Sequence, residues 1–408
     1  GDNALASVGA SGPVLNLLIL FFIGISTGVN IMVSQYFGAK KKEELANSIA
    51  TAILLTAGVS LFLMLVAPFL IRPFLRFLNT PEQILFSASR YLRILMYGIA
   101  GAAYFNILSG ILRGLGDSIS SLYYLLFATI VNIVLDILFV AVFNMGVAGV
   151  SLATIIAQGL SAILAYRKLT TFTDIFVLPK AHFKVNMEYI KQMLKLGLPS
   201  GATQGIFSLA MLLIQSLSNQ FGEFYIAASL MVMRVDGLAM LPNFSYGFAM
   251  TTYAGQNVGA KRMDRVLKGT KQGTILAITT SIILTSIILL FGHRLMLLFT
   301  QTEELAAYAL KLLYILAPGY IFFSITQSLS GVMRGAGDTM TPMWISILLT
   351  FGIRVPLAYG ISYLTRSPAY PIGRHEAIFI SLVITWTLGA VLTYIFYRKG
   401  KWKSKAIL

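Results

Sequence analysis

Long apolar stretches without a single charged residue recur along the whole chain, and they limit it to few folds. Examples are residues 14–37, 53–71 and 275–292. Each is close to the roughly 20 residues that an α-helix needs to cross the hydrocarbon core of a bilayer. The strands of a membrane barrel would place a polar residue at every second position, and these stretches do not. The pattern predicts an all-α polytopic membrane protein.

The charge content agrees with this prediction. Charged residues make up 11% of the chain, whereas soluble domains carry roughly 25%. We expect eleven membrane spans. Their approximate bounds are 11–35, 47–71, 84–111, 119–142, 147–166, 197–219, 225–253, 267–292, 306–332, 340–363 and 376–397.

The basic residues are divided unevenly between the two ends of these spans. Of the 31 Lys and Arg residues, 21 fall on one face and 8 on the other, while Arg234 and Arg354 lie deeper inside spans. Cytoplasmic connections are the ones enriched in Lys and Arg. The count therefore places the C-terminus in the cytoplasm and the chain in the plasma (inner) membrane, with residue 1 outside.

The chain contains an internal repeat. The stretch LSGILRGLGD at 108–117 returns as LSGVMRGAGD at 329–338, 221 positions later, with seven of ten residues identical. The same offset relates Gln35 to Gln256, each followed by a Gly-Ala-Lys triplet. Each strip ends a span. We expect its glycines to stop the helix, its aspartate to cap the next helix and its arginine to anchor the end at the lipid headgroups.

The repeat predicts two lobes of six helices related by a pseudo-twofold axis along the membrane normal. The span that opens near Leu196 has no counterpart, because that counterpart would precede residue 1. We therefore expect the first helix to be missing from this chain. The predicted organisation is an N-terminal lobe at 1–169 with five of its six helices, a cytoplasmic hinge at 170–195, and a C-terminal lobe with a basic tail at 196–408. A short amphipathic helix is expected at 185–195, within the hinge.

The paired G-x-x-R-G-x-G-D strips, the Gln-x-x-Gly-Ala-Lys helix ends and the stretch NIVLDILFVAVFNMGVAGVSLAT resemble the multidrug and toxic compound extrusion (MATE) family over essentially the whole chain. The resemblance implies a twelve-helix fold of two lobes. It also implies efflux of amphipathic, often cationic compounds against a proton or sodium gradient.

The strongest candidate for coupling to a cation lies in the first lobe. Asp136 is ionisable at membrane depth, where charges are costly and usually functional, and Asn132 lies four residues earlier on the same helix face. Asp136 could exchange a proton or hold a sodium ion; the alternative is a structural hydrogen bond to a neighbouring helix.

Asn132, Asp136 and Thr154 also match a polar site of the DinF-like branch of the family. The acid that this branch carries on its first helix has no match here. The NorM-like branch carries acidic residues in spans that correspond to 197–219 and 306–332, and neither contains one.

The second lobe has candidates for the charge of a substrate cavity. They are Arg354, close to Pro356, and the pair Arg234 and Asp236, whose i,i+2 spacing points them to different helix faces. Each has a structural alternative, as a partner for backbone carbonyls or for a neighbouring helix. Gln35 and Gln256 are candidate gate, packing or substrate contacts.

Adaptable apolar side chains suit promiscuous binding. Those expected near a substrate are Phe207, Met211, Met231, Met233, Phe244, Tyr246 and Met250.

These features favour a secondary antiporter that works by alternating access, without a cofactor, and exports amphipathic, cationic small molecules in exchange for protons or sodium ions. The alternative is a flippase for a lipid-linked oligosaccharide or lipid precursor, which would favour several cationic residues in the cavity. We expect a monomer in the bilayer, with no nucleic-acid partner and no enzymatic activity, since the three histidines lie in the hinge or at span ends.

Overall fold

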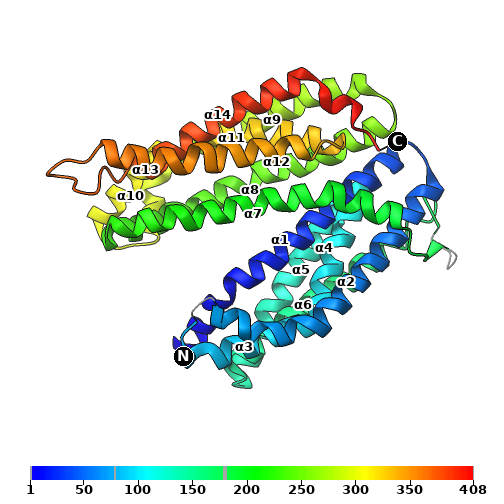
Figure 1. The fold of residues 1–408 in the computed structure, drawn as a ribbon, viewed down its shortest axis with the longest axis horizontal. Helices are drawn as coiled ribbons and strands as arrows, with labels where there is room; N and C mark the ends of the chain where they lie inside the picture. The colour runs from blue at the N-terminus through cyan, green and yellow to red at the C-terminus, as the bar shows by residue number, and fades with distance from the viewer. Residues whose placement is uncertain (1, 78–79, 178–181, 408) are drawn as a thin grey trace. The chain divides into compact units, whose positions relative to one another are not determined.

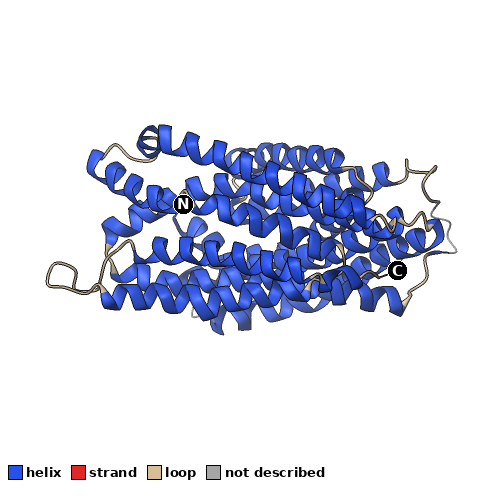
Figure 2. Ribbon diagram, turned by 90° about the horizontal axis from the view of Figure 1, so that it is seen from above, coloured by secondary structure: helices blue, strands red, loops and turns tan. Residues whose placement is uncertain are grey.

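The computed structural model describes residues 2–77, 80–177 and 182–407, and this part of the chain is almost entirely helical (Figure 2). Its one extended pairing is an isolated bridge between Ser367 and Tyr370. Nine of the described helices are long and apolar enough to cross a membrane, and the spans number eleven if each of two bent helix pairs counts as one. The all-α prediction is confirmed.

The chain divides into two compact units, residues 1–201 and 202–408 (Figure 1). The two units share the same order of elements as far as the π-helix. The first unit contains α1 (Asp2–Gly38), α2 (Lys42–Phe77), α3 (Glu82–Tyr97), α4 (Ile99–Gly114), α5 (Ser118–Asp136), the π-helix η1 (Ile137–Val142) and α6 (Gly146–Leu169). The second contains α8 (Glu223–Gly259), α9 (Met263–Leu297), α10 (Glu303–Leu316), α11 (Gly319–Gly335), α12 (Met340–Ile347), the π-helix η3 (Leu348–Arg354), α13 (Val355–Leu364), α14 (Ala377–Lys399) and the short 3₁₀ helix η4 (Lys401–Ser404).

Helix α7 (Met187–Gln220) belongs to both units, because their boundary falls inside it. The separate short helix expected at 185–195 is wrong, since these residues lead into and form the first turns of α7. Gly197 and Gly201 of this helix lie directly against Gly24 of α1, with Gly201 Cα 2.8 Å from the place where a side chain on Gly24 would begin. The close contact with α1 holds this end of α7 within the first unit.

Two of the expected spans are bent. The span predicted at 84–111 consists of α3 and α4, which meet at Gly98 with a bend of 52°. The span predicted at 306–332 consists of α10 and α11, which bend by 44° near Pro318. Proline lacks an N–H group and cannot continue the helical hydrogen bonds, and glycine tolerates the irregular backbone.

The first glycine of each strip lies inside its helix and serves helix contact rather than helix termination. A side chain on Gly110 would collide with the Ser26 carbonyl of α1, and one on Gly331 with the Gly247 carbonyl of α8. Ser26 and Gly247 are themselves 221 positions apart. The repeat therefore preserves one close contact, α4 on α1 in the first unit and α11 on α8 in the second.

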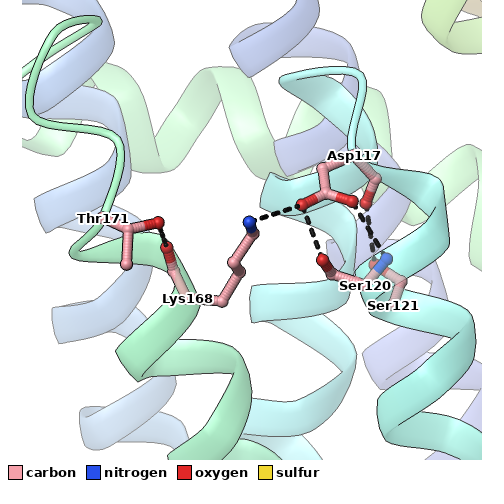
Figure 3. A network of polar contacts seen from close by, with 5 residues as sticks. All are labelled: Asp117, Ser120, Ser121, Lys168 and Thr171. Atoms are coloured by element: carbon pink, nitrogen blue, oxygen red, sulfur yellow. Dashed lines mark hydrogen bonds and ion pairs between the residues drawn. The ribbon is translucent and has the colours of Figure 1, made fainter.

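The end of each strip forms the turn that the sequence predicts. Gly116 and Gly337 have φ values of 96° and 99°, which glycine adopts far more readily than other residues. Asp117 then accepts a hydrogen bond from the Ser120 N–H at 2.9 Å and caps α5 (Figure 3). Asp338 accepts one from the Thr341 N–H at 3.1 Å. The expected caps are confirmed in both units.

The surroundings of the two caps differ. Lys168 of α6 lies 3.7 Å from the Asp117 carboxylate, and the Ser120 hydroxyl donates to the same group (Figure 3). Asp338 is 6% exposed, and Gly337 just before it lies against Lys405 of the C-terminal tail, where Trp402 is buried among α8, α9 and α11. The strip arginines are half-buried, and Arg334 Nη2 lies 3.4 Å from the place where a side chain would begin on Gly247. Arg334 is therefore directed toward Gly247 of α8, whereas the sequence led us to expect it at the lipid headgroups.

Candidate functional site

The second unit encloses a cavity of about 330 Å³, large enough for a small organic molecule. Its walls come from α7, α8 and α14, with single residues from α10, α11 and the π-helix η3. The lining is mostly apolar and aromatic. It includes Phe207, Met211, Ile214, Gln215, Ser218, Tyr225, Val232, Met233, Asp236, Met240, Phe244, Phe323, Arg354, Phe379, Leu382 and Trp386.

Two opposite charges line this cavity. Asp236 projects from α8 and Arg354 from the last position of η3, and each attracts the other electrostatically. In the described part of the chain they form no direct ion pair, and Asp236 Oδ1 and Arg354 Nε are buried without a hydrogen-bond partner. Buried polar atoms are normally hydrogen-bonded. These two unsatisfied atoms therefore leave acceptor and donor capacity beside the cavity for a bound molecule.

Some of the residues predicted to lie near a substrate line the cavity, and others pack elsewhere. Phe207, Met211, Met233 and Phe244 line the cavity. Met231 instead packs into the buried core of the unit. The remaining two, Tyr246 and Met250, also lie elsewhere, since the Tyr246 hydroxyl is 2.7 Å from that of Thr280 and Met250 packs in the cluster around Trp402.

Arg234 does not line the cavity and is exposed, whereas Asp236 two residues later does line it. Their predicted placement on different faces of α8 is therefore correct. Gln35 is fully buried near the end of α1, and Gln256 is half-buried at the equivalent place in α8. Their carbonyls accept hydrogen bonds from Ala39 and Ala260, the alanines of the Gly-Ala-Lys triplets.

The first unit brings two of its three predicted polar residues together. Asn132 Nδ2 donates to Thr154 Oγ1 at 3.5 Å, and the Thr154 hydroxyl donates to the Val150 carbonyl at 3.0 Å. Asp136 is the last residue of α5, where the helix passes into the π-helix η1. Its Oδ1 atom is buried, and among the described residues it has no hydrogen-bond partner.

Several residues near these sites were not anticipated. The Tyr91 side chain lies within electrostatic range of Asp136. Gln158 follows Thr154 by one helical turn, and its buried Oε1 also lacks a partner in the described part of the chain. In the second unit, the cavity residues Gln215, Tyr225 and Trp386 were not expected. No signal in the sequence separates these polar and aromatic side chains from others inside spans.

The sequence and the fold of this chain are similar to those of known proteins. The sequence model of the MatE family matches residues 1–138 and 199–360. The probable multidrug resistance protein YoeA of Bacillus subtilis (strain 168) is 28% identical over 414 residues, covering 100% of this chain and 88% of that protein. The probable multidrug resistance protein NorM of Thermotoga maritima is 25% identical, covering 100% and 87%.

Among solved structures, the outward-facing conformation of a multidrug resistance MATE family transporter of the MOP superfamily is similar, with a TM-score of 0.91. The identity is 22%, over 98% of this chain and 88% of that one. A MOP superfamily transporter from Pyrococcus furiosus, whose binding pocket is described as having reverse polarity, gives a TM-score of 0.89 at 22% identity. These likenesses establish the fold, and the match to the family model establishes that the chain belongs to the MATE family of membrane transporters.

Proposed function

We propose that this chain is a secondary antiporter that exports amphipathic small molecules in exchange for protons or sodium ions. The observation that carries the proposal is the buried, unpartnered oxygen of Asp136. An ionised carboxylate away from water requires a proton, a cation or a hydrogen-bond donor. Asp136 is the residue that binds and releases the coupling ion.

The surroundings of Asp136 support this role. The Asn132 amide and the Thr154 hydroxyl are joined by a hydrogen bond and supply further oxygen atoms in the same unit. Oxygen ligands of this kind suit either a proton relay or a hard cation. The branch of the family remains a prediction, since relatives named YoeA and NorM both match the chain.

The substrate site of the proposal is the cavity of the second unit. Two relatives of this chain are named probable multidrug resistance proteins. The aromatic and methionine side chains that line the cavity can adapt to varied apolar molecules. Asp236 would attract a cationic group on the substrate. A lipid-linked pyrophosphate would need several cations, but Arg354 is the one basic residue among the described lining residues. The flippase alternative is therefore not favoured.

Transport by this mechanism requires that the two conformations of the carrier bind the ion and the substrate with different affinities, since a ligand that binds both equally shifts neither population. Binding of the coupling ion at Asp136 changes the packing of α5 and η1, and the gradient drives release of the substrate outward. The orientation with the C-terminus in the cytoplasm follows from the basic residues alone.

The proposal is tested in proteoliposomes with a fluorescent organic cation, under a proton gradient alone and a sodium gradient alone. We expect one gradient to drive uptake by the unaltered protein, and Asp136→Asn to abolish it while the protein stays folded. Asp117→Asn is the matched control, because an asparagine still caps α5. Gradient-driven transport by Asp136→Asn at the control's rate would show that Asp136 does not couple transport.

A further inference from the structure

Three arginines, one near the C-terminal end of α2 and two within α3, share one pocket on the face opposite the predicted cytoplasmic side. Arg72, Arg90 and Arg93 line a pocket of about 260 Å³ together with Phe86, Ser89 and Ile94. This face carries 8 of the basic residues, and the three arginines are concentrated at a single place on it. A non-cytoplasmic face is depleted of Lys and Arg, so the cluster has no explanation in membrane orientation.

The three guanidinium groups are not neutralised within the described part of the chain. The carboxylate of this region, Glu82, pairs with a different arginine, Arg76, at 3.3 Å. None of the three forms an ion pair with a described residue, and all three are exposed. The pocket therefore presents a concentrated positive charge to whatever surrounds it.

The second half of the chain contains basic residues at two of the equivalent positions, and there each one is paired with an acid. The positions equivalent to Arg72 and Arg90, 221 residues later, are His293 and Lys311. His293 lies 3.0 Å from the Glu303 carboxylate, and Lys311 lies 2.6 Å from that of Glu376. The second unit thus pairs each basic group with an acid, whereas the first unit leaves both without one.

The third arginine gives the sharpest comparison. Arg93 Nε donates to the Pro68 carbonyl at 3.1 Å. At the equivalent position of the second unit, the Tyr314 hydroxyl donates to the Leu289 carbonyl at 3.3 Å. Pro68 and Leu289 are also 221 residues apart. A neutral tyrosine makes the same helix contact, so the positive charge of Arg93 is not needed for that contact.

We propose that this three-arginine pocket binds the phosphate headgroup of an anionic phospholipid. Arginine is well suited to phosphate, because its planar group offers several N–H donors to phosphate oxygens. Phe86, which lines the pocket, is 72% exposed, and Phe69 and Leu70 beside Pro68 are 77% and 58% exposed. These apolar side chains contact acyl chains while the arginines hold the headgroup. A soluble phosphate would use the arginines but not this apolar border.

The test measures lipid binding to the purified protein in detergent by native mass spectrometry and by thermal stabilisation. The probes are phosphatidylglycerol, phosphatidylcholine with the same acyl chains, and inorganic phosphate. We expect the unaltered protein to retain and be stabilised by phosphatidylglycerol. The Arg72→Gln/Arg90→Gln/Arg93→Gln variant should bind it at least about tenfold more weakly, as expected when charged hydrogen bonds are lost.

Two further variants separate loss of lipid binding from a general loss of charge or of stability. Lys401→Gln/Lys403→Gln/Lys405→Gln removes the same charge from the C-terminal tail and should bind the lipid normally. Arg93→Tyr copies the second unit, so it should keep the hydrogen bond to Pro68 and the unfolding temperature but weaken lipid binding about tenfold. Unchanged binding by both arginine variants would overturn the proposal. Equal stabilisation by phosphatidylcholine would also overturn it, and stabilisation by inorganic phosphate as large as that by lipid would reassign the pocket to a soluble anion.

Discussion

Gly335 ends α11 where this helix crosses α8, and it offers a direct test of the interpretation of the repeated strip. A side chain on Gly335 would begin 2.9 Å from Ala254 Cβ and 2.9 Å from the Gly255 nitrogen, and it would also meet the Thr251 carbonyl. Carbon atoms in ordinary contact are about 3.5–4.0 Å apart. Gly335→Ala therefore forces the two helices apart by at least about 0.6–1 Å at this point.

The energetic cost follows from this displacement. The contacting atoms belong to backbone or to the first carbon of a side chain, so none of them can rotate away. Overpacking of this kind costs about 1–3 kcal/mol. The gain in helix propensity from Gly to Ala, at most about 1 kcal/mol in a helix interior, is smaller here because Gly335 is the last residue of α11. We expect net destabilisation and a lower unfolding temperature in detergent.

Gly360 provides the matched control. It lies inside α13 of the same unit, and no atom lies within 4 Å of the place where a side chain would begin. Gly360→Ala should therefore stabilise the protein by up to about 1 kcal/mol. The unfolding temperatures of the two variants, measured side by side, should fall on opposite sides of the unaltered protein. If Gly335→Ala is as stable as Gly360→Ala, the strip glycines do not hold α11 against α8.

Asp338→Ala should cost about 1 kcal/mol of stability through loss of the cap on α12, and Asp338→Asn much less, as measured by thermal unfolding. Asp236→Asn should weaken binding of an organic cation, whereas Arg354→Gln should strengthen it by removing an opposing positive charge; fluorescence titration of the purified protein with a cationic dye separates the two. Glu376 lies just before α14, and although burial opposes ionisation of its carboxyl group, the hydrogen bond from Lys311, a backbone hydrogen bond and the charges of Lys311 and Arg374 together outweigh this, so its pKa is lowered. The stability it contributes is therefore present at neutral pH and lost as the pH falls through that lowered pKa. In Lys311→Gln the loss should begin at higher pH, which unfolding temperatures between pH 7 and pH 4 would reveal.

The sequence was sufficient to predict the helices but not their interruptions. Hydropathy reports where the chain is apolar, and each bent pair passes as one apolar span, so it does not reveal that the helices bend by 52° at Gly98 and by 44° near Pro318. The continuity of α7 was missed for the opposite reason. Gly197 and Pro199 suggest a break, but the close contact of Gly197 and Gly201 with Gly24 stabilises an uninterrupted helix.

Two of the three charged candidates in the second unit line the cavity, whereas Arg234 does not. Asp236 and Arg354 stand out because ionisable groups are costly at membrane depth, and both line the cavity. Met231 and Met233 cannot both do so, because residues two apart on a helix point about 200° apart. The sequence does not say which one faces inward. The structure places Met233 at the cavity and Met231 in the core.

The repeat also separates what a position contributes to folding from what it adds to function. Asp117 and Asp338 cap equivalent helices, so their carboxylates belong to the fold. Asp136 has Leu357 as its counterpart 221 positions away, and the second unit forms the equivalent span without a carboxylate there.

Asp236 and Arg354 follow the same rule. Their counterparts in the first unit are Leu15 and Ile133, both apolar. A charge placed inside a membrane span costs free energy that an apolar residue at the same position does not. Because one half of this chain folds without each of these three charges, their presence in the other half supports the proposed roles of these residues in binding an ion and a substrate.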